Sequence, residues 1–420
     1  MEEIIKELKR IIDFIDGNIY IVGGYIRDLI KYGKNNINSD DIDIIFSGDI
    51  DYLIEALKDN NYKIFSLKAS LGIYRAIKGK SHIDIALLKG DNLYKDLKSR
   101  DFTINSICMN IKNDEIIDYF NGVSHIKNGI LKETSKNSIN ADPVRILRGL
   151  RFVIEYDLQI DKPTLNHIIE EIDKIETCPK ERIFIEFMKI IKVDSEGILG
   201  VLLEQIKQHS GRKILYTDNK IFCMRTYNIY KKFMKNKLNF NQIDNKVFNR
   251  EIAEFEIELF LGVATILMDN TSDSNNIIRY SEKLGVPKTG QELIIKIING
   301  TKFVIDYYKK DLKCFKSELY DFFKGYANYL PYILIVSYCK DVFASNMRFE
   351  ELLLKFNTEY IKFNAIKENK LLKSKDIIKL TGVKGRIISE AIELIDKEVY
   401  LGNIKTKEDA SKVLIQKYLC

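Results

Sequence analysis

The chain has 420 residues, of which 45% are hydrophobic and 30% are charged, a balance typical of globular proteins that excludes a disordered chain. Its length predicts roughly two to four domains, and its low content of proline and glycine (5 Pro and 22 Gly) favours helices. The net charge of +6 suits a phosphate-rich partner without requiring one. Residues 361–420 hold 13 basic and 8 acidic residues, so most of the excess charge lies there.

The sequence predicts no membrane segment and no zinc site. The chain begins Met1-Glu2-Glu3, without the basic region of a secretory signal, and its longest uncharged run is 15 residues, from Gly325 to Cys339. Such a run is too short to span a membrane and predicts a buried helix. The six cysteines are scattered without a CxxC pattern. We therefore expect reduced thiols in a cytoplasmic protein.

The first segment that could bind a ligand is a predicted strand over 19–22, followed by Gly23 and Gly24. An amphipathic helix over 1–14 precedes it and a helix over 25–30 follows. Two glycines let the backbone approach a ligand, and the helix N-terminus presents N–H groups to an anion that Arg27 can also reach. Many Gly-Gly turns, however, only reverse the chain.

Asp41 and Asp43 lie in the next predicted strand, over 40–46. Because side chains alternate along a strand, both carboxylates point to one face. Two adjacent carboxylates repel each other and need a cation, and Mg²⁺ binds through one or two carboxylates plus substrate phosphates. The alternative is an edge strand whose polar residues face water.

A helix over 51–59 and three further strands, over 62–67, 72–77 and 82–88, are predicted next. The last strand contains Asp84, which is either a third carboxylate of the metal site or a solvent-facing side chain. An Arg100-Asp101 pair then opens an apolar periodic segment, with Asn105 four residues beyond Asp101. A hairpin is predicted around residues 118–122, and from residue 142 onward the pattern is helical.

The segment that begins Asp142-Pro143 predicts a helix, with Asp at the N-cap and Pro at the first position. Arg145, Arg148 and Arg151 recur every three residues, so they share one side of this helix. Three aligned guanidiniums need an anion in front of them. A triphosphate or acidic partners from another helix would both serve.

The rest of the chain is predicted to be helical. A helix led by Glu181 and Arg182 comes first, and residues 191–360 show helical periodicity without a chemical motif. A Gly-basic-Gly-basic turn then carries Lys384 and Arg386. Such a turn can bring N–H groups and cations to a phosphodiester, although Gly382 can equally be an ordinary helix C-cap.

The order of these motifs predicts more than any one of them. Together they form a site for Mg²⁺, a triphosphate and an attacking hydroxyl, which is the arrangement of two-metal nucleotidyl transfer. Four motifs resemble, in order, those of the class II tRNA nucleotidyltransferases (CCA-adding enzymes) and the related bacterial poly(A) polymerases: residues 23–28, 41–43, 100–105 and 142–152.

This resemblance implies an α+β protein with a polymerase-β-like nucleotidyltransferase head that contains a small mixed sheet, followed by all-α parts. The expected boundaries are a head over 1–137, a neck for nucleotide selection over 138–190, a body over 191–360 and a basic, tRNA-binding tail over 361–420. Lys384 and Arg386 belong to the RNA-binding tail.

The resemblance also implies roles for single residues. Asp41 and Asp43 would bind two catalytic Mg²⁺ ions. The incoming nucleotide would be bound by seven residues: Gly24, Arg27, Arg100, Asp142, Arg145, Arg148 and Arg151. Of these, Asp142 and Arg145 would read the base edge, since Asp accepts from an exocyclic amine and Arg donates to ring or carbonyl acceptors.

Two departures from the family pattern bear on specificity. Ala141 stands where the family usually has Glu, and only 15 residues separate Asp84 from Arg100, as in CC-adding members with a shortened loop. We therefore expect addition of C residues (CC, or CCA from CTP and ATP) to the 3′ end of tRNA, with no protein partner predicted. The alternatives are a poly(A) polymerase and a catalytically inactive RNA-binding protein with the same fold.

Overall fold

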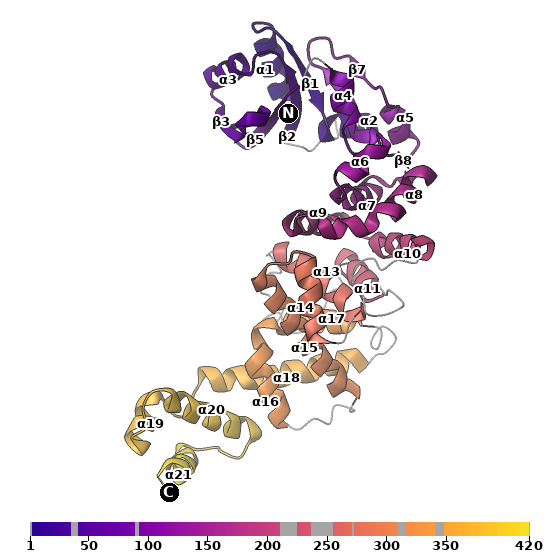
Figure 1. Cartoon of the computed structure of the whole chain (residues 1–420). Helices are drawn as coiled ribbons and strands as arrows, with labels where there is room; N and C mark the ends of the chain where they lie inside the picture. The colour runs from indigo at the N-terminus through magenta and orange to yellow at the C-terminus, as the bar shows by residue number, and fades with distance from the viewer. Residues whose placement is uncertain are drawn as a thin grey trace. The chain divides into compact units, whose positions relative to one another are not determined.

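The computed structural model describes residues 2–34, 41–88, 92–210, 225–236, 255–270, 273–309, 316–340 and 348–419. The chain divides into two compact units, residues 1–194 with 205–214, and residues 195–204 with 215–420. The first unit contains a mixed sheet with helices, and the described part of the second is helical (Figure 1). This confirms the predicted α+β class. The finer division into head, neck, body and tail stays a prediction.

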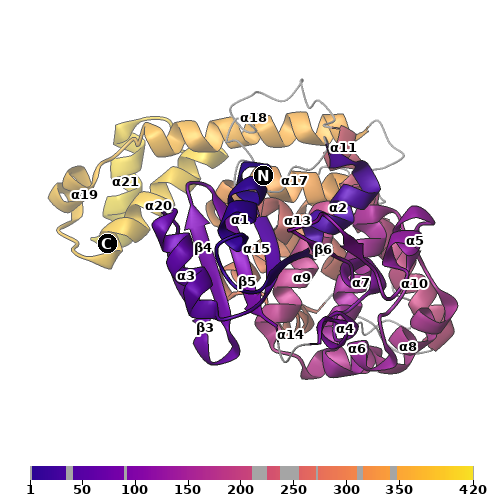
Figure 2. The same cartoon turned by 90° about the horizontal axis from the view of Figure 1, so that it is seen from above.

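The first unit is built on a seven-stranded sheet in the order β3-β4-β5-β2-β1-β6-β7. Figure 2 labels β3, β4, β5 and β6 of this sheet. Strands β2 and β5 are parallel, and the other neighbouring pairs are antiparallel. The bounds are β1 Asn18–Val22, β2 Asp41–Ser47, β3 Lys63–Lys68, β4 Ile73–Lys78, β5 Ser81–Leu87, β6 Cys108–Asn110 and β7 Ile116–Ile117. The predicted strands before residue 88 are confirmed.

Strand β2 shows how the sequence presents its carboxylates. Ile42 and Ile44 are buried on one face, whereas Asp41 and Asp43 are exposed on the other. Further along that second face, Ile45 is buried in a small core with Leu97 of α4 (Leu93–Lys98). Helix α4 therefore covers one end of this face and leaves the carboxylate end open.

Helices α1 (Glu2–Ile12), α2 (Gly24–Tyr32) and α3 (Ile50–Asp59) form where the pattern predicts them. The predicted hairpin around residues 118–122 is wrong. The antiparallel pair β6–β7 lies ahead of it, and Asp118 instead accepts hydrogen bonds from the backbone N–H groups of Gly122 (2.8 Å) and Val123 (2.9 Å). A carboxylate that satisfies these N–H groups starts a helix, α5 (Gly122–Lys127).

The remaining helices of the first unit include α6 (Lys136–Ala141), α7 (Val144–Tyr156), α8 (Lys162–Glu171) and α9 (Lys180–Val193). Helix α7 is the predicted arginine helix. It begins after Pro143, as expected, but the side chain of Asp142 does not cap it. Short strands β8 (Ile130–Leu131) and β9 (Gln159–Ile160) pair in parallel beside it.

The described part of the second unit consists of helices. Helix α10 (Ile198–Ser210) crosses the boundary between the units. The others are α11 Arg225–Asn236, α13 Phe255–Asn270, α14 Ser274–Lys283, α15 Lys288–Lys309, α16 Lys316–Tyr326, α17 Leu330–Cys339, α18 Arg348–Glu368, α19 Ser374–Thr381, α20 Arg386–Leu401 and α21 Lys407–Tyr418. Helix α17 is almost entirely buried, which confirms the buried helix predicted in the uncharged run. Among the described helices, none is long and apolar enough to cross a membrane.

The predicted buried thiols are present in the described residues, where Cys108, Cys178 and Cys339 are free and buried. Cys223, Cys314 and Cys420 lie outside the described residues.

Candidate active site

The carboxylates of β2 lie in register with charged residues on the neighbouring strand. Asp41 pairs with His82 of β5, and Asp43 pairs with Asp84. Residues at paired positions share a face, so Asp43 and Asp84 are adjacent carboxylates. Oδ1 of Asp41 lies 2.7 Å from Nδ1 of His82.

Asp43 sits beside the glycine turn at the end of β1. Gly23 has φ +73°, and a Cβ atom built there would lie 2.7 Å from Oδ2 of Asp43. The turn therefore requires glycine both for its backbone conformation and for the space that Asp43 occupies. Asp43 is open to solvent on one side and surrounded by protein on the others. Desolvation by this protein raises the pKa of Asp43, and the charge of Asp84 raises it further, whereas Arg100 and Arg27 lower it.

Asp84 is held by an arginine of its own. Nε and Nη2 of Arg75 on β4 donate to its two carboxylate oxygens at 2.6 and 2.7 Å. Asp84 thus lies on the same face as the pair in β2, but both of its oxygens are bound to a cation. Within the described residues, no group of three His, Cys, Asp or Glu side chains is arranged to hold a metal ion alone. The donor set that Asp41 and Asp43 offer fits a hard cation that takes its remaining ligands from a substrate.

A cavity of about 410 Å³ opens beside Asp43. It brings together all of the sequence-predicted residues of the first unit except Asp41. Six arginines and three aspartates line it, which leaves an excess of three positive charges and favours an anionic ligand. The complete lining is Gly23, Gly24, Arg27, Asp43, Arg100, Asp101, Asn105, Asp142, Arg145, Arg148, Arg151, Phe152 and Arg182.

Two of the three arginines of α7, Arg148 and Arg151, have acidic partners, one of the two alternatives that the sequence leaves open. Nε of Arg148 donates to Asp101 at 2.8 Å, and Nε of Arg151 donates to Glu186 of α9 at 3.1 Å. Glu186 is 6% exposed and also lies 3.8 Å from Nη1 of Arg148. Both guanidiniums nevertheless line the cavity, so these carboxylates fix their positions at its wall.

Arg27 is more deeply buried than its predicted role suggests, with 8% of its surface exposed. Nη1 donates to Asn105 at 2.5 Å, and Nη2 donates to the hydroxyl of Tyr156 at 2.6 Å. The guanidinium also stacks 4.4 Å from the centre of the Tyr156 ring. Its Nε has no hydrogen-bond partner among the described residues. Arg27 therefore joins α2 to α7 and lines the cavity at the same time.

Asp142 and Arg145 line the same cavity as Asp43, and each is held by its own hydrogen-bond partners. Nη2 of Arg182 donates to Oδ2 of Asp142 at 2.5 Å. Nη1 of Arg145 donates to the backbone carbonyls of Ser99 (2.9 Å) and Ser138 (3.0 Å). Burial lowers the pKa of Arg145, whereas the charge of Asp101 raises it.

Comparisons with known proteins find similar sequences and similar folds. Residues 19–132 match the family described as "Poly A polymerase head domain", and residues 157–195 match that described as "Probable RNA and SrmB- binding site of polymerase A". The CCA-adding enzyme of Ligilactobacillus salivarius is 25% identical over 423 residues, which cover 95% of this chain and 93% of that enzyme. The CC-adding tRNA nucleotidyltransferase of Shouchella clausii is 29% identical over 205 residues, covering 48% of this chain and 52% of that protein.

Solved structures share the fold over the whole chain. A CCA-adding enzyme with ATP superimposes with a TM-score of 0.72 at 20% identity, covering 100% of this chain and 94% of that one. The Thermotoga maritima CCA-adding enzyme complexed with tRNA gives 0.65 at 19% identity, covering 99% and 95%. In sequence and fold, the chain is therefore similar to tRNA nucleotidyltransferases and poly(A) polymerases. The first matched segment contains Asp41, Asp43 and Arg100.

Several residues at this cavity are not among the site residues that the sequence predicts. Asp101, Asn105, Phe152 and Arg182 line the cavity, and Glu186 lies directly behind it. The spacing of Asp101 and Asn105 is a signal, because Asn105 donates back to Asp101 at 2.9 Å. The role of Glu186 cannot be read from spacing, since it depends on how α9 packs against α7.

The predicted RNA-binding residues of the tail lie in the second unit. Gly382 is the left-handed C-cap of α19, and Gly385 precedes α20, so the predicted turn between two helices is confirmed. Arg386 has a side chain that is 92% exposed, and its Nε lies 3.2 Å from Glu390. Lys384 is also exposed. An RNA-binding role for either residue remains a prediction.

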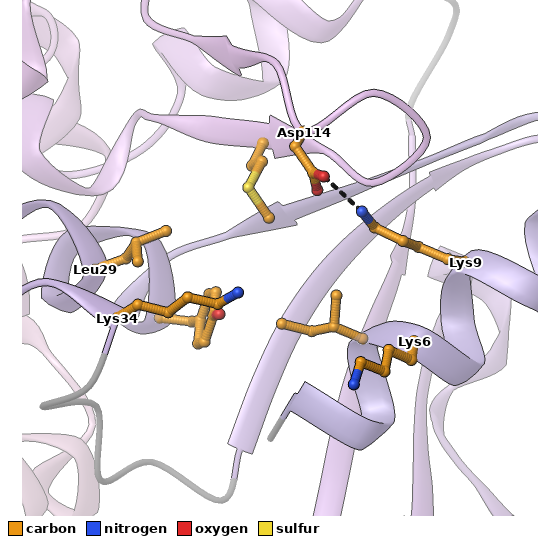
Figure 3. Close-up of a pocket in the computed structure, with 8 residues that line it drawn as sticks. Lys6, Lys9, Leu29, Lys34 and Asp114 are labelled. Atoms are coloured by element: carbon orange, nitrogen blue, oxygen red, sulfur yellow. Dashed lines mark hydrogen bonds and ion pairs between the residues drawn. The ribbon is translucent and has the colours of Figure 1, made fainter.

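The first unit has a second cavity of about 390 Å³ between α1, α2 and the β6–β7 hairpin (Figure 3). Its floor includes Leu29 and Met109, and Nζ of Lys9 donates to Asp114 at 2.6 Å across its wall. It lacks a pair of carboxylates for a metal. The first cavity, which contains Asp43, is therefore the candidate site for nucleotidyl transfer.

Proposed function

We propose that this protein adds C residues to the 3′ end of tRNA without a template, either CC from CTP or CCA from CTP and ATP, and releases pyrophosphate. The observation that carries the proposal is the position of Asp43 at the edge of the arginine-lined cavity, next to the glycine turn at residue 23. The CCA-adding and CC-adding relatives support the choice of tRNA over other RNA. A tRNA substrate would place the activity in the cytoplasm.

The reaction that fits this cavity is attack of an RNA 3′-hydroxyl on the α-phosphorus of a nucleoside triphosphate. A bond forms between the 3′ oxygen and the α-phosphorus, the bond to the bridging β-phosphate oxygen breaks, and the hydroxyl proton is lost. Arg148 and Arg151, held in place by Asp101 and Glu186, would bind the triphosphate and the leaving pyrophosphate. Fixed cations that need no reorganisation favour such a transition state.

Asp41 and Asp43 would hold Mg²⁺, because their carboxylate oxygens are ligands of the kind that this ion prefers. The raised pKa of Asp43 means that its charge lacks sufficient compensation from the protein, and the carboxylates leave room for phosphate ligands. Two Mg²⁺ ions there would lower the pKa of the 3′-hydroxyl and offset the charge of the leaving pyrophosphate.

Asp142 and Arg145 would select the base. Both C and A carry an exocyclic amine that a carboxylate accepts, and both offer a ring or carbonyl acceptor for a guanidinium. Arg145 is held by two backbone carbonyls, which orient it although Ala141 replaces the glutamate of the family pattern.

The proposal is tested with three tRNA transcripts that end before the first C, after CC and after CCA. Each is incubated with labelled CTP or ATP, alone or together, and the products are sized. We expect extension of the first transcript with CTP, and loss of this activity in Asp41→Ala and Asp43→Ala, which remove the carboxylates that would hold Mg²⁺. Extension of any RNA with ATP alone would instead support a poly(A) polymerase. RNA binding without incorporation would indicate an inactive RNA-binding protein.

The same experiment decides between CC and CCA addition. The connection between Asp84 and Arg100 has 15 residues, of which 89–91 lie outside the described part of the chain. If its length limits the enzyme to CC, extension stops there even with ATP present. Efficient addition of the terminal A to the second transcript would contradict that reading.

A further inference from the structure

The two rows of residues that contain the catalytic carboxylates continue across the sheet to its free edge. In the first row, Asp41 pairs with His82, His82 with Ile77 and Ile77 with Lys63. The next row runs through Asp43, Asp84, Arg75 and Phe65 in the same way. Paired residues share a face, so Lys63 and Phe65 of β3 face the same side as the carboxylates.

A third residue of β3 joins this face. The register shifts between Ser66 and Lys68, and beyond the shift Lys68 pairs with Ile73 of β4. Ile73 lies two residues from Arg75 and therefore on the carboxylate face. The edge strand thus presents a cation, an aromatic ring and a second cation on this face, with isoleucines from β4 beside them. We call Lys63, Phe65, Lys68, Ile73, Arg75 and Ile77 the edge face.

The β3 side chains of the edge face are exposed, and those of β4 are half-buried. Phe65 is 49% exposed, and Lys63 and Lys68 are also exposed. Near the hairpin end, Leu71 is 44% exposed as well. An aromatic ring and apolar surface between cations, exposed beside an active site, has the composition of single-stranded nucleic-acid binding surfaces, where bases stack on rings and cations follow the phosphates.

We propose that the edge face binds the 3′-terminal, single-stranded nucleotides of the RNA, with a base stacked on Phe65 and the phosphates near Lys63 and Lys68. This inference rests on the proposed function and adds the path of its RNA substrate.

The position of the triphosphate cavity determines this path. Gly23 follows β1, which pairs with β2 on the side opposite to β5, and the arginine-lined cavity opens on that side. In an in-line displacement, the attacking hydroxyl approaches the α-phosphorus from the side opposite to the leaving pyrophosphate. If the pyrophosphate lies in the arginine-lined cavity, the hydroxyl approaches from the side of Asp43 that faces β5. That side consists of β5, β4 and β3. Three strand spacings separate Phe65 from Asp43, or roughly 14 Å, which a few extended nucleotides can span.

The test measures RNA binding and turnover in the full-length protein with Phe65→Ala, Phe65→Tyr and the double variant Lys63→Gln/Lys68→Gln. Tyr52→Ala is the matched control, because Tyr52 is an aromatic residue of α3 that is 63% exposed and lies outside both rows. The RNA is a tRNA minihelix that lacks CCA and carries 2-aminopurine, a base whose fluorescence is quenched by stacking, near its 3′ end.

We expect Phe65→Ala to raise the KM for this RNA by about 5- to 150-fold, the range for loss of one stacked base, and to raise the KM for CTP far less. Quenching of 2-aminopurine should be lost in Phe65→Ala and retained in Phe65→Tyr and Tyr52→Ala. The lysine double variant should make RNA binding less dependent on salt.

Equal RNA KM and equal quenching in the wild type and Phe65→Ala would overturn the inference, while incorporation of CTP by both would leave the proposed function intact. Absence of incorporation in the wild type would instead contradict the proposed function. The quenching measurement still tests the edge face in that case, since it needs no turnover.

Discussion

Nη2 of Arg182 donates a hydrogen bond to Oδ2 of Asp142 at 2.5 Å, across the gap between α9 and the start of α7. The bond raises the pKa of Arg182. With Oδ2 fixed in this way, the carboxylate has one orientation in which Oδ1 can accept a hydrogen bond from the amine of a base. The residue proposed to read the base is therefore positioned by an arginine from a different helix.

The first prediction concerns Arg182→Ala. Without the guanidinium, Asp142 rotates more freely and discriminates less well between CTP and UTP, which lacks the exocyclic amine. We expect the ratio of kcat/KM for CTP over UTP to fall about tenfold or more, the usual effect of losing a hydrogen bond to a charged group. Lys180→Ala, an exposed cation at the start of the same helix, should leave the ratio unchanged. A lower kcat/KM for both nucleotides at a constant ratio would contradict the positioning role.

The two adjacent glycines give a second prediction, because Gly23 has a positive φ that favours glycine and Gly24 does not. Gly23→Ala forces a left-handed conformation on alanine and drives Cβ into Asp43, so we expect a loss of about 1 to 3 kcal/mol in the free energy of unfolding, together with a large loss of turnover. Gly24→Ala meets only Nη2 of Arg27, at 3.6 Å, and begins a helix. It should leave stability unchanged or slightly higher and raise the KM for CTP. Urea unfolding and steady-state kinetics of both variants check this, and equal destabilisation would argue against the contact with Asp43.

Local patterns were sufficient to predict the strands that carry Asp41, Asp43 and Asp84, because alternation and glycine placement are properties of a few consecutive residues. They also predicted that Arg145, Arg148 and Arg151 share one side of a helix. The partners of these arginines could not be predicted, since Glu186 and Asp101 reach α7 only through tertiary packing. The sequence therefore left a triphosphate and acidic partners as alternatives. In the structure Arg148 and Arg151 have acidic partners and also line the cavity.

The prediction of a hairpin at residues 118–122 was wrong because of contacts within this short segment. Asn and Gly at the end of this segment are typical of a turn, but Asp118 binds the N–H groups of Gly122 and Val123 and starts α5. Hairpin turns and helix starts use the same residue types, and only the following residues distinguish them.

A third prediction follows from the crowding of Asp43. Its charge is destabilised by desolvation and by Asp84, so Asp43→Asn should raise the midpoint of thermal unfolding in the absence of divalent ions. Addition of Mg²⁺ should stabilise the wild type in a concentration-dependent way and have a smaller effect on the variant. Differential scanning fluorimetry in EDTA and in a Mg²⁺ series measures both effects. Equal stabilisation of the two proteins by Mg²⁺ would show that Asp43 does not bind the metal.

Glu186 gives a fourth prediction, because one buried carboxylate serves Arg148, Arg151 and Lys189. Glu186→Ala leaves these cations without their shared partner. Because Arg148 keeps Asp101 and Arg151 keeps Glu155, we expect a loss of about 1 to 3 kcal/mol in stability, with a higher KM for CTP. Glu186→Gln should lose less, since the amide oxygen still accepts a hydrogen bond. Glu181→Ala, an exposed carboxylate on the same helix, is the control for urea unfolding and should change stability little.

The last prediction is a pH dependence that originates at Asp101. Arg148 and Asn105 hold the pKa of this buried carboxyl below its usual value, although burial alone would raise it. Because the pKa is lower in the folded than in the unfolded protein, the ionised carboxylate contributes stability above the unfolded pKa, which is about 3.9. That contribution is lost as the pH falls through the folded value.

Asp101→Asn removes the contribution at every pH, and we expect it to cost about 3 kcal/mol at pH 7. The difference in the free energy of unfolding between wild type and variant should stay constant down to about pH 5 and then shrink steadily as the pH falls below about 4. Urea unfolding of both proteins between pH 7 and pH 3 measures this difference directly, because the titration of all other carboxylates is common to the two. A difference that stays constant or grows on acidification would show that the ion pair with Arg148 does not stabilise the folded state.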